Sequence, residues 1–346
     1  MRVFLVLLLL VGLAMPVYAA EITAPPVTGE AQDLMPQGMP GFGEGLWYIV
    51  KTAVKSLRPD LADSCRLCVS VVGITMLISI LNSFSEKTAD AVNLAGILAI
   101  GTLLLSSAHT LISAAAETVE QISSYGKLLL PVMTAAVAAQ GGTVSSAALY
   151  TGTAFFDALL GTMISAILVP MVYVFLSLVI GNCAIGEGFL KQLRDFLKWL
   201  ISWSMKTVLY VFTGYMSISS VITGGTDKTA LKAAKLTISG VVPVVGGIMS
   251  DASETILVGA GVVKNAAGVY GILAVIAILV LPFLRVGILY LLLKVTAAIC
   301  GVFSSGKIND LIQGFSEAMG FLMGMTGTVS LLLLISIVCF LKGMSG

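Results

Sequence analysis

The sequence predicts an all-α protein: a polytopic transmembrane helical bundle with about six to eight membrane segments, some broken or re-entrant, and interfacial amphipathic helices. Composition supports this class, because 58% of the 346 residues are hydrophobic and only 11% are charged, whereas ordinary soluble domains are about 25% charged. The mean hydropathy is +1.03. Apolar stretches of helical-span length also recur along most of the chain, separated by short polar connections.

Charge and motif content narrow the function classes. The chain has 19 Lys and Arg against 18 Asp and Glu, so there is no basic excess for binding nucleic acid, and the expected partner surface is the lipid bilayer. Five cysteines and one histidine form no dense cluster typical of a metal site or a disulfide scaffold. We find no nucleophile elbow, phosphate loop, metalloprotease motif or dinucleotide fingerprint. We therefore expect neither an enzyme nor a cofactor.

Residues 1–19 have the pattern of a secretory signal peptide. Arg2 supplies a positive start, Val3–Leu13 is a short apolar core, and the small-residue end at Val17-Tyr18-Ala19 predicts cleavage after Ala19. An uncleaved first membrane helix is the alternative. The apolar core is about 11–13 residues, short of the roughly 20 needed to span a bilayer, so we expect an exported mature N-terminus.

Residues 20–60 are predicted to form an exported N-terminal segment that ends in an interfacial helix. The part up to Gly45 is rich in Pro, Gly and acidic residues, which is typical of extended chain. After it, Trp47, Val50, Val54 and Leu57 recur at helical spacing, with basic residues between them. This pattern favours a helix on the membrane surface with the tryptophan at headgroup level. A helix packed on a partner would show the same pattern.

Residues 61–346 are predicted to form the transmembrane domain. Leu128–Leu149 contains Pro131, Gly141 and Gly142 and is a candidate for a re-entrant segment, which would leave the loop with Glu117 and Glu120 outside. That topology would also place the basic stretch Gly186–Lys198 in the cytoplasm. The predicted apolar segments are Leu67–Asn82, Ala91–Ala115, Leu128–Leu149, Phe155–Gly181, Leu200–Val221, Leu236–Val263, Ala266–Leu293 and Met319–Leu341.

Two patterns suggest further organisation within this domain. As a helix, Gly186–Leu200 would have one apolar face and one charged face. This pattern predicts an in-plane interfacial helix that joins two spans. A docking surface for a cytoplasmic partner is the alternative. Ala166–Pro170 (AILVP) is echoed by Ala277–Pro282 (AILVLP), and an amphipathic stretch and another apolar segment follow each. These echoes suggest a weak repeat of residues 155–223 and 266–341, as in transporter-like proteins. Chance resemblance between apolar sequences competes with this interpretation.

The stretch Ser239–Gly268 combines an apolar, small-residue composition with two carboxylates. Asp251 and Glu254 are three residues apart and would share one face of a helix. Ionisable groups at membrane depth are costly unless they are paired or face a protein interior. We therefore expect this stretch inside a membrane assembly, at an interface or beside a pathway. Its candidate functional residues are Pro243, Gly246, Gly247, Asp251, Glu254 and Lys264.

Two roles for the carboxylates remain open. As a close pair, Asp251 and Glu254 could share a proton and act as a proton or cation relay. In a wet loop between half-helices they would instead be caps, because Ser250-Asp-Ala-Ser-Glu254 contains good capping residues. Lys264 lies about 15 Å further along a continuous helix and cannot be their partner there. Arg285 follows Pro282 in an apolar run and is a candidate partner for Asp251, Glu254 or Asp157.

Two other residue sets have simpler interpretations. His109 is expected to be a hydrogen-bonded structural residue within its span. Cys65 and Cys68 have redox spacing, but they begin an apolar helix without a thioredoxin-like context, so we interpret them as packing residues.

The block VPVVGG…SDASET within Ser239–Gly268, together with the preceding run Thr223–Lys235 (TGGTDKTALKAAK), resembles the stage III sporulation protein AE family of endospore-forming bacteria. The resemblance implies a polytopic protein in the mother-cell membrane that surrounds the forespore. Its implied partners are the other products of the stage III A operon, which meet stage II sporulation protein Q from the forespore side. It further implies a channel or feeding complex that keeps the forespore active and supports its late sigma factor.

Two function classes follow from these observations. In the first, the protein is a structural or conduit subunit of that complex, with a homo-oligomer as one form, and the 239–268 block packs against sister subunits. In the second, it is a transporter-like permease in which Asp251 and Glu254 couple ion or proton movement to a solute. The resemblance favours the first class, and the broken segments with the weak repeat favour the second.

Overall fold

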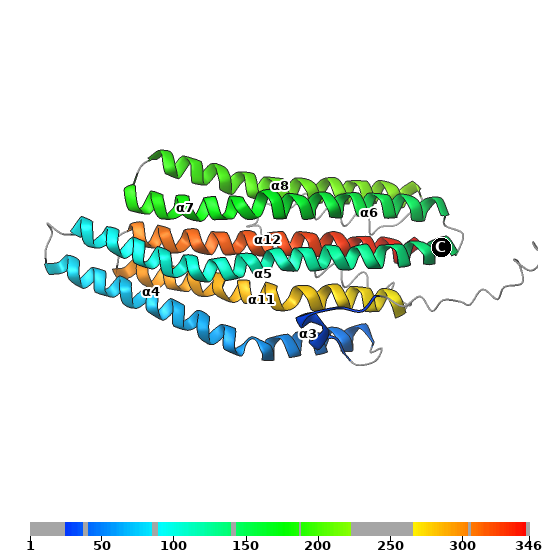
Figure 1. Ribbon diagram of the computed structural model, residues 1–346, viewed down its shortest axis with the longest axis horizontal. Helices are drawn as coiled ribbons and strands as arrows, with labels where there is room; N and C mark the ends of the chain where they lie inside the picture. Colours follow the sequence, from blue (N-terminus) through cyan, green and yellow to red (C-terminus); the bar gives the residue numbers. More distant parts are fainter. Residues whose placement is uncertain are drawn as a thin grey trace, which may run out of the picture.

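The computed structural model describes residues 25–36, 41–84, 89–139, 143–186, 188–222, 266–303 and 306–343. Every regular element in these residues is a helix, and the long helices lie side by side in an elongated bundle (Figure 1). The predicted all-α class is confirmed. The elements are α2 (Glu30–Leu34), α3 (Phe42–Ser56), α4 (Arg58–Phe84), α5 (Ala89–Ala139), α6 (Thr143–Met163), a π-helical turn (Ile164–Leu168), α7 (Val169–Ile185), α8 (Gly188–Ile222), α11 (Ala266–Phe303) and α12 (Gly306–Gly343).

Helix α5 is the longest element, with 51 residues. At a rise of 1.5 Å per residue it extends over about 76 Å, more than twice the roughly 30 Å hydrocarbon thickness of a bilayer. The predicted loop containing Glu117 and Glu120 is wrong, because both residues lie within this helix. The stretch between Ala115 and Leu128 is rich in good helix formers and has only one glycine, so nothing in it ends the helix.

Leu128–Leu149 does not form one straight span. Its first residues, 128–139, complete α5, and its last, 143–149, begin α6, which packs against α5. The described residues of this segment thus belong to two helices, and a re-entrant path through a membrane stays a prediction. The turn itself, residues 140–142, lies outside the described part of the chain.

Helices α6 and α7 are continuous through the π-helical turn Ile164–Leu168. Pro170 lies in the first turn of α7. A proline has no N–H to donate to the carbonyl four residues earlier, and its ring crowds that carbonyl. A local change of helical pitch relieves this crowding. The AILVP motif therefore marks a defect in a long helix rather than its end.

The predicted in-plane helix over Gly186–Leu200 is wrong as a separate element. Gly186 ends α7 in the left-handed conformation, with φ 80°, which glycine adopts without steric cost. The chain then runs without a break from Gly188 to Ile222 as α8. The amphipathic stretch is thus the first half of a long helix, and its large side chains Phe189, Phe196, Trp199 and Trp203 are exposed.

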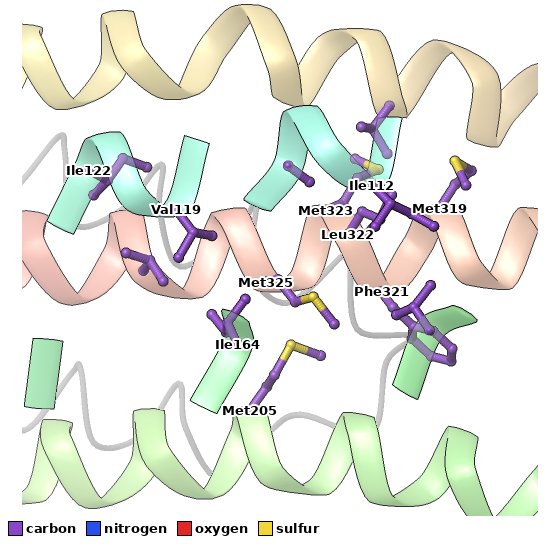
Figure 2. Packing of buried hydrophobic residues seen from close by; sticks show 14 of the residues in the cluster. Ile112, Val119, Ile122, Ile164, Met205, Met319, Phe321, Leu322, Met323 and Met325 are labelled. Carbon is purple, nitrogen blue, oxygen red and sulfur yellow. The ribbon is translucent and has the colours of Figure 1, made fainter. Parts of the chain in front are cut away.

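Helix α12 is the core of the bundle. It packs against α5, α6, α7, α8 and α11, and Figure 1 shows it between the other layers. Figure 2 shows its Met319, Phe321, Leu322 and Met325 among side chains of α5, α8 and the π-helical turn. Its buried hydroxyls need no outside partner, because Thr328 and Ser336, for example, donate to carbonyls one turn earlier.

Five described helical stretches are long and apolar enough to cross a membrane: Arg58–Phe84, Ala89–Ala135, Ala147–Ile185, Gly268–Phe303 and Gly306–Leu341. A multi-pass helical membrane protein is therefore supported. The predicted segment Leu200–Val221 is helical within α8 but is not among these five. The predicted segment Leu236–Val263 lies outside the described residues.

Candidate functional site

The predicted acidic block cannot be placed within the described structure. Pro243, Gly246, Gly247, Asp251, Glu254 and Lys264 all lie outside the described residues. Their roles, as caps or as a relay, stay predictions. Of the candidate functional residues, Arg285 is the one that the structure describes.

Arg285 joins three separate helices. Its Nε donates to Asp60 Oδ2 on α4 at 2.9 Å, and one of its terminal nitrogens, Nη1, donates to Glu30 Oε2 on α2, also at 2.9 Å. The planar guanidinium presents several donors in a fixed fork and can hold two carboxylates at once. Both acids are in the first turns of their helices, where the helix dipole also stabilises a negative charge.

The arginine cluster, defined as Arg285, Asp60 and Glu30, ties the N-terminal segment to the bundle. Beside the ion pairs, α2 buries Ala31 and Leu34, and Val27 just before it is 5% exposed. The ion pairs differ in exposure: the side chain of Glu30 is 67% exposed, whereas those of Asp60 and Arg285 are 34% and 27% exposed. Because water screens exposed pairs, the Asp60 pair contributes more to stability than the Glu30 pair.

The predicted pairing of Arg285 with Asp157 is wrong. Asp157 lies on α6 and accepts a hydrogen bond from Ser123 Oγ of α5 at 2.7 Å, while Arg285 pairs with Asp60 and Glu30. Helix α11 packs against α2, α3, α4, α5 and α12. Its arginine therefore lies beside the acids of residues 20–60 and pairs with them. Sequence reasoning missed Glu30 and Asp60, although their positions at helix starts were a usable signal.

A cavity of about 340 Å³ lies next to the N-terminal segment. Pro26, Val27 and Thr28 form one wall, and α5 supplies the opposite wall with Glu117, Glu120, Gln121, Ser124, Tyr125 and Leu128, together with Ile278 of α11. Glu117 accepts a hydrogen bond from Gln121 at 3.2 Å. The acidic residues that we expected in an exported loop therefore line a hollow beneath the predicted exported segment.

The helix predicted before Pro59 is present as α3, but it buries a different face, and its place at the membrane surface stays a prediction. Ile49 and Ala53 are buried, whereas Trp47 and Val54 are 68% and 56% exposed. Helix α3 packs on α11 and presents its tryptophan outward beside Lys51. This arrangement suits a helix at the bundle surface with an aromatic side chain free to contact lipid.

The smaller predictions have mixed outcomes. His109 is hydrogen-bonded, with Nδ1 at 2.7 Å from the Tyr173 hydroxyl, as expected of a structural residue. Cys68 is buried, but Cys65 is exposed, so the packing role is confirmed for Cys68 only.

The segments of the proposed repeat, 155–223 and 266–341, each fold into two long helices joined at a break. Their amphipathic stretches meet, because Lys198 Nζ lies 2.6 Å from Glu317 Oε1. A common origin of the two segments stays a prediction.

Comparison with known proteins decides the family. The family model described as "Stage III sporulation protein AE" matches residues 40–343. The chain belongs to this family. The stage III sporulation protein AE of Bacillus subtilis (strain 168) is 25% identical over 257 residues, which cover 74% of this chain and 64% of the relative. The matched region thus spans less than two thirds of the relative's length. No solved structure matches the chain.

The family to which the chain belongs is named for a stage III sporulation protein. The match includes the arginine of α11, Asp60 of α4 and all five candidate membrane helices, whereas Glu30 precedes the matched residues. The resemblance stated from the central block is therefore confirmed at the level of the family.

Proposed function

We propose that this protein is a membrane subunit of the complex that links mother cell and forespore, and that it keeps the forespore active during development. The observation that carries the proposal is the family match over residues 40–343. Five apolar helices of spanning length support residence in a membrane. The proposed location is the mother-cell membrane around the forespore, and the proposed partners are the other stage III A operon proteins and, indirectly, stage II sporulation protein Q.

The bundle's surface supports a subunit role rather than that of an isolated soluble factor. Large apolar side chains are exposed on α4, α6, α8 and α11, for example Phe84, Phe155, Trp203 and Leu291. An exterior of this kind is stable against lipid or against apolar protein, but not against water. The N-terminal segment held by the arginine cluster gives the exported side of the proposed complex a folded surface.

A deletion and complementation experiment in the host tests this proposal. We expect cells that lack the gene to complete engulfment and then fail to produce mature spores, and we expect the full chain to restore them. Forespore-specific late transcription, followed with a fluorescent reporter, should fall in the deletion strain. Normal spore yield in the deletion strain would contradict the proposed function.

Location and partners need a separate measurement. A tagged full chain should concentrate in the membrane around the engulfed forespore and co-purify the other stage III A proteins from detergent extracts. A matched control is a tagged, unrelated multi-pass protein of the same cells, which should label all mother-cell membranes and co-purify none of them. Equal recovery of the stage III A proteins with both baits would contradict the proposed assembly.

A further inference from the structure

A buried carboxylate outside the arginine cluster lacks the partners that its charge requires. Asp157 is 3% exposed. Its Oδ2 accepts the hydrogen bond from Ser123, but its Oδ1 has no hydrogen-bond partner among the described residues. None of the described lysines and arginines forms an ion pair with it. An unpaired carboxylate in such surroundings costs far more than one hydroxyl hydrogen bond returns.

Further oxygen atoms share this position between α5 and α6. Thr153 lies one turn before Asp157 on the same face of α6; it is fully buried, and its Oγ1 has no partner among the described residues. Ser123 of α5 is 7% exposed. Gly161, one turn after Asp157, faces α5, because an added Cβ there would lie in ordinary contact with Ser123, 3.7 Å from its Oγ.

The charged groups on the neighbouring helices do not neutralise this acid directly. Lys127 lies one turn after Ser123 on α5, but its side chain is exposed, and within the described part of the chain it forms neither a hydrogen bond nor an ion pair with Asp157. Helix α8 contributes Lys206 and Tyr215, and the Tyr215 hydroxyl donates to the carbonyl of Ala148. Helix α12 has no Asp, Glu, Lys, Arg or His between Glu317 and Lys342. A single negative charge among neutral hydroxyls therefore remains.

We propose that Asp157, Ser123 and Thr153 form a binding site for a small monovalent cation, either a proton or Na⁺. One carboxylate matches one positive charge, and hydroxyl and carboxylate oxygens are the ligands that hard cations prefer. The π-helical turn Ile164–Leu168 begins three residues after Gly161. Such turns are rare in helices and are frequent at functional sites. Neither the sporulation role nor Asp251 and Glu254, which lie outside the described residues, contributes to this inference.

The test uses the full chain purified in lipid nanodiscs, with Asp157→Asn as the main variant. The matched control is Asp63→Asn, which changes an exposed aspartate whose only described ion pair is with Arg66. Unfolding temperatures are measured in Na⁺ and in N-methyl-D-glucamine at equal ionic strength and pH. Infrared spectra are recorded in parallel to detect a protonated carboxyl group.

The two candidate cations, Na⁺ and a proton, give different signals in these measurements. If Na⁺ binds, it should raise the unfolding temperature of the wild type and of Asp63→Asn but not that of Asp157→Asn. If a proton binds, the wild type and Asp63→Asn should show a protonated-carboxyl band that is independent of Na⁺ and is missing in Asp157→Asn. Either result supports the site. If the wild type shows neither signal, or if a folded Asp157→Asn protein keeps the signal of the wild type, the site is overturned.

Two further variants keep the proposal testable if Asp157→Asn does not fold. Ser123→Ala removes the hydroxyl donor and should weaken Na⁺ stabilisation or shift the carboxyl band, because that hydrogen bond is lost. Lys127→Met should leave either signal in place. If the signals are instead absent in the wild type and appear only in Lys127→Met, the lysine neutralises Asp157 and the cation site is refuted.

Discussion

The contact between α12 and α7 gives a quantitative test of the bundle. At Gly314 of α12, an added Cβ would lie 2.5 and 2.7 Å from the two γ-methyl carbons of Val179 and 3.2 Å from its Cβ. Carbon atoms in contact are normally about 3.5–4.0 Å apart. Because the added methyl meets both methyl groups, rotating the valine does not relieve the clash, and the two helices must move apart.

We expect Gly314→Ala to destabilise the folded bundle. Replacing glycine in a helix interior by alanine favours folding by about 1 kcal/mol, whereas overpacking in a well-filled core costs about 1–3 kcal/mol. The net change in the free energy of unfolding should therefore be a loss of about 0–2 kcal/mol. The control is Gly214→Ala on α8, where an added Cβ meets nothing within 4 Å. It should stabilise the bundle by up to about 1 kcal/mol.

Reversible unfolding in mixed detergent micelles measures both variants. The decisive comparison is the double variant Gly314→Ala with Val179→Ala, in which the new methyl fills the space that the valine vacates. It should be more stable than Gly314→Ala alone. If Gly314→Ala is as benign as Gly214→Ala, or if the double variant recovers nothing, the packing of α12 on α7 described here is wrong.

Three further predictions concern the polar groups and the N-terminus. Asp60→Asn should lower the free energy of unfolding by about 1–3 kcal/mol and Glu30→Gln by at most about 1 kcal/mol, because Glu30 is the more exposed partner of the arginine; equal losses in the unfolding assay would contradict this ranking. Asp251→Asn and Glu254→Gln should leave spore yield near normal, since an amide oxygen still caps a helix; lost yield with the assembly intact would favour a coupling role. N-terminal sequencing of the exported protein should show cleavage after Ala19, and a retained N-terminus would refute the signal peptide.

Local patterns along the chain predicted much of the fold. The helical class, the apolar segments and the amphipathic stretch before Pro59 follow from composition and periodicity, which depend only on neighbouring residues. Helix ends were harder to predict. The polar residues Glu117 and Glu120 suggested a loop, yet they lie within α5, because a polar residue on a helix surface does not interrupt its backbone hydrogen bonds.

The sequence by itself determined that this protein is a helical membrane protein of the stage III sporulation protein AE family. Composition and a specific residue block carry this information, and both can be recognised without knowledge of the fold. Only the tertiary structure decided which charges meet. Arg285 lies 225 residues from Asp60 and 255 from Glu30, and the pattern of one helix does not state which neighbour its polar side chains face. For the same reason, the buried position of Asp157 beside Ser123 emerged only when α5 and α6 were seen packed together.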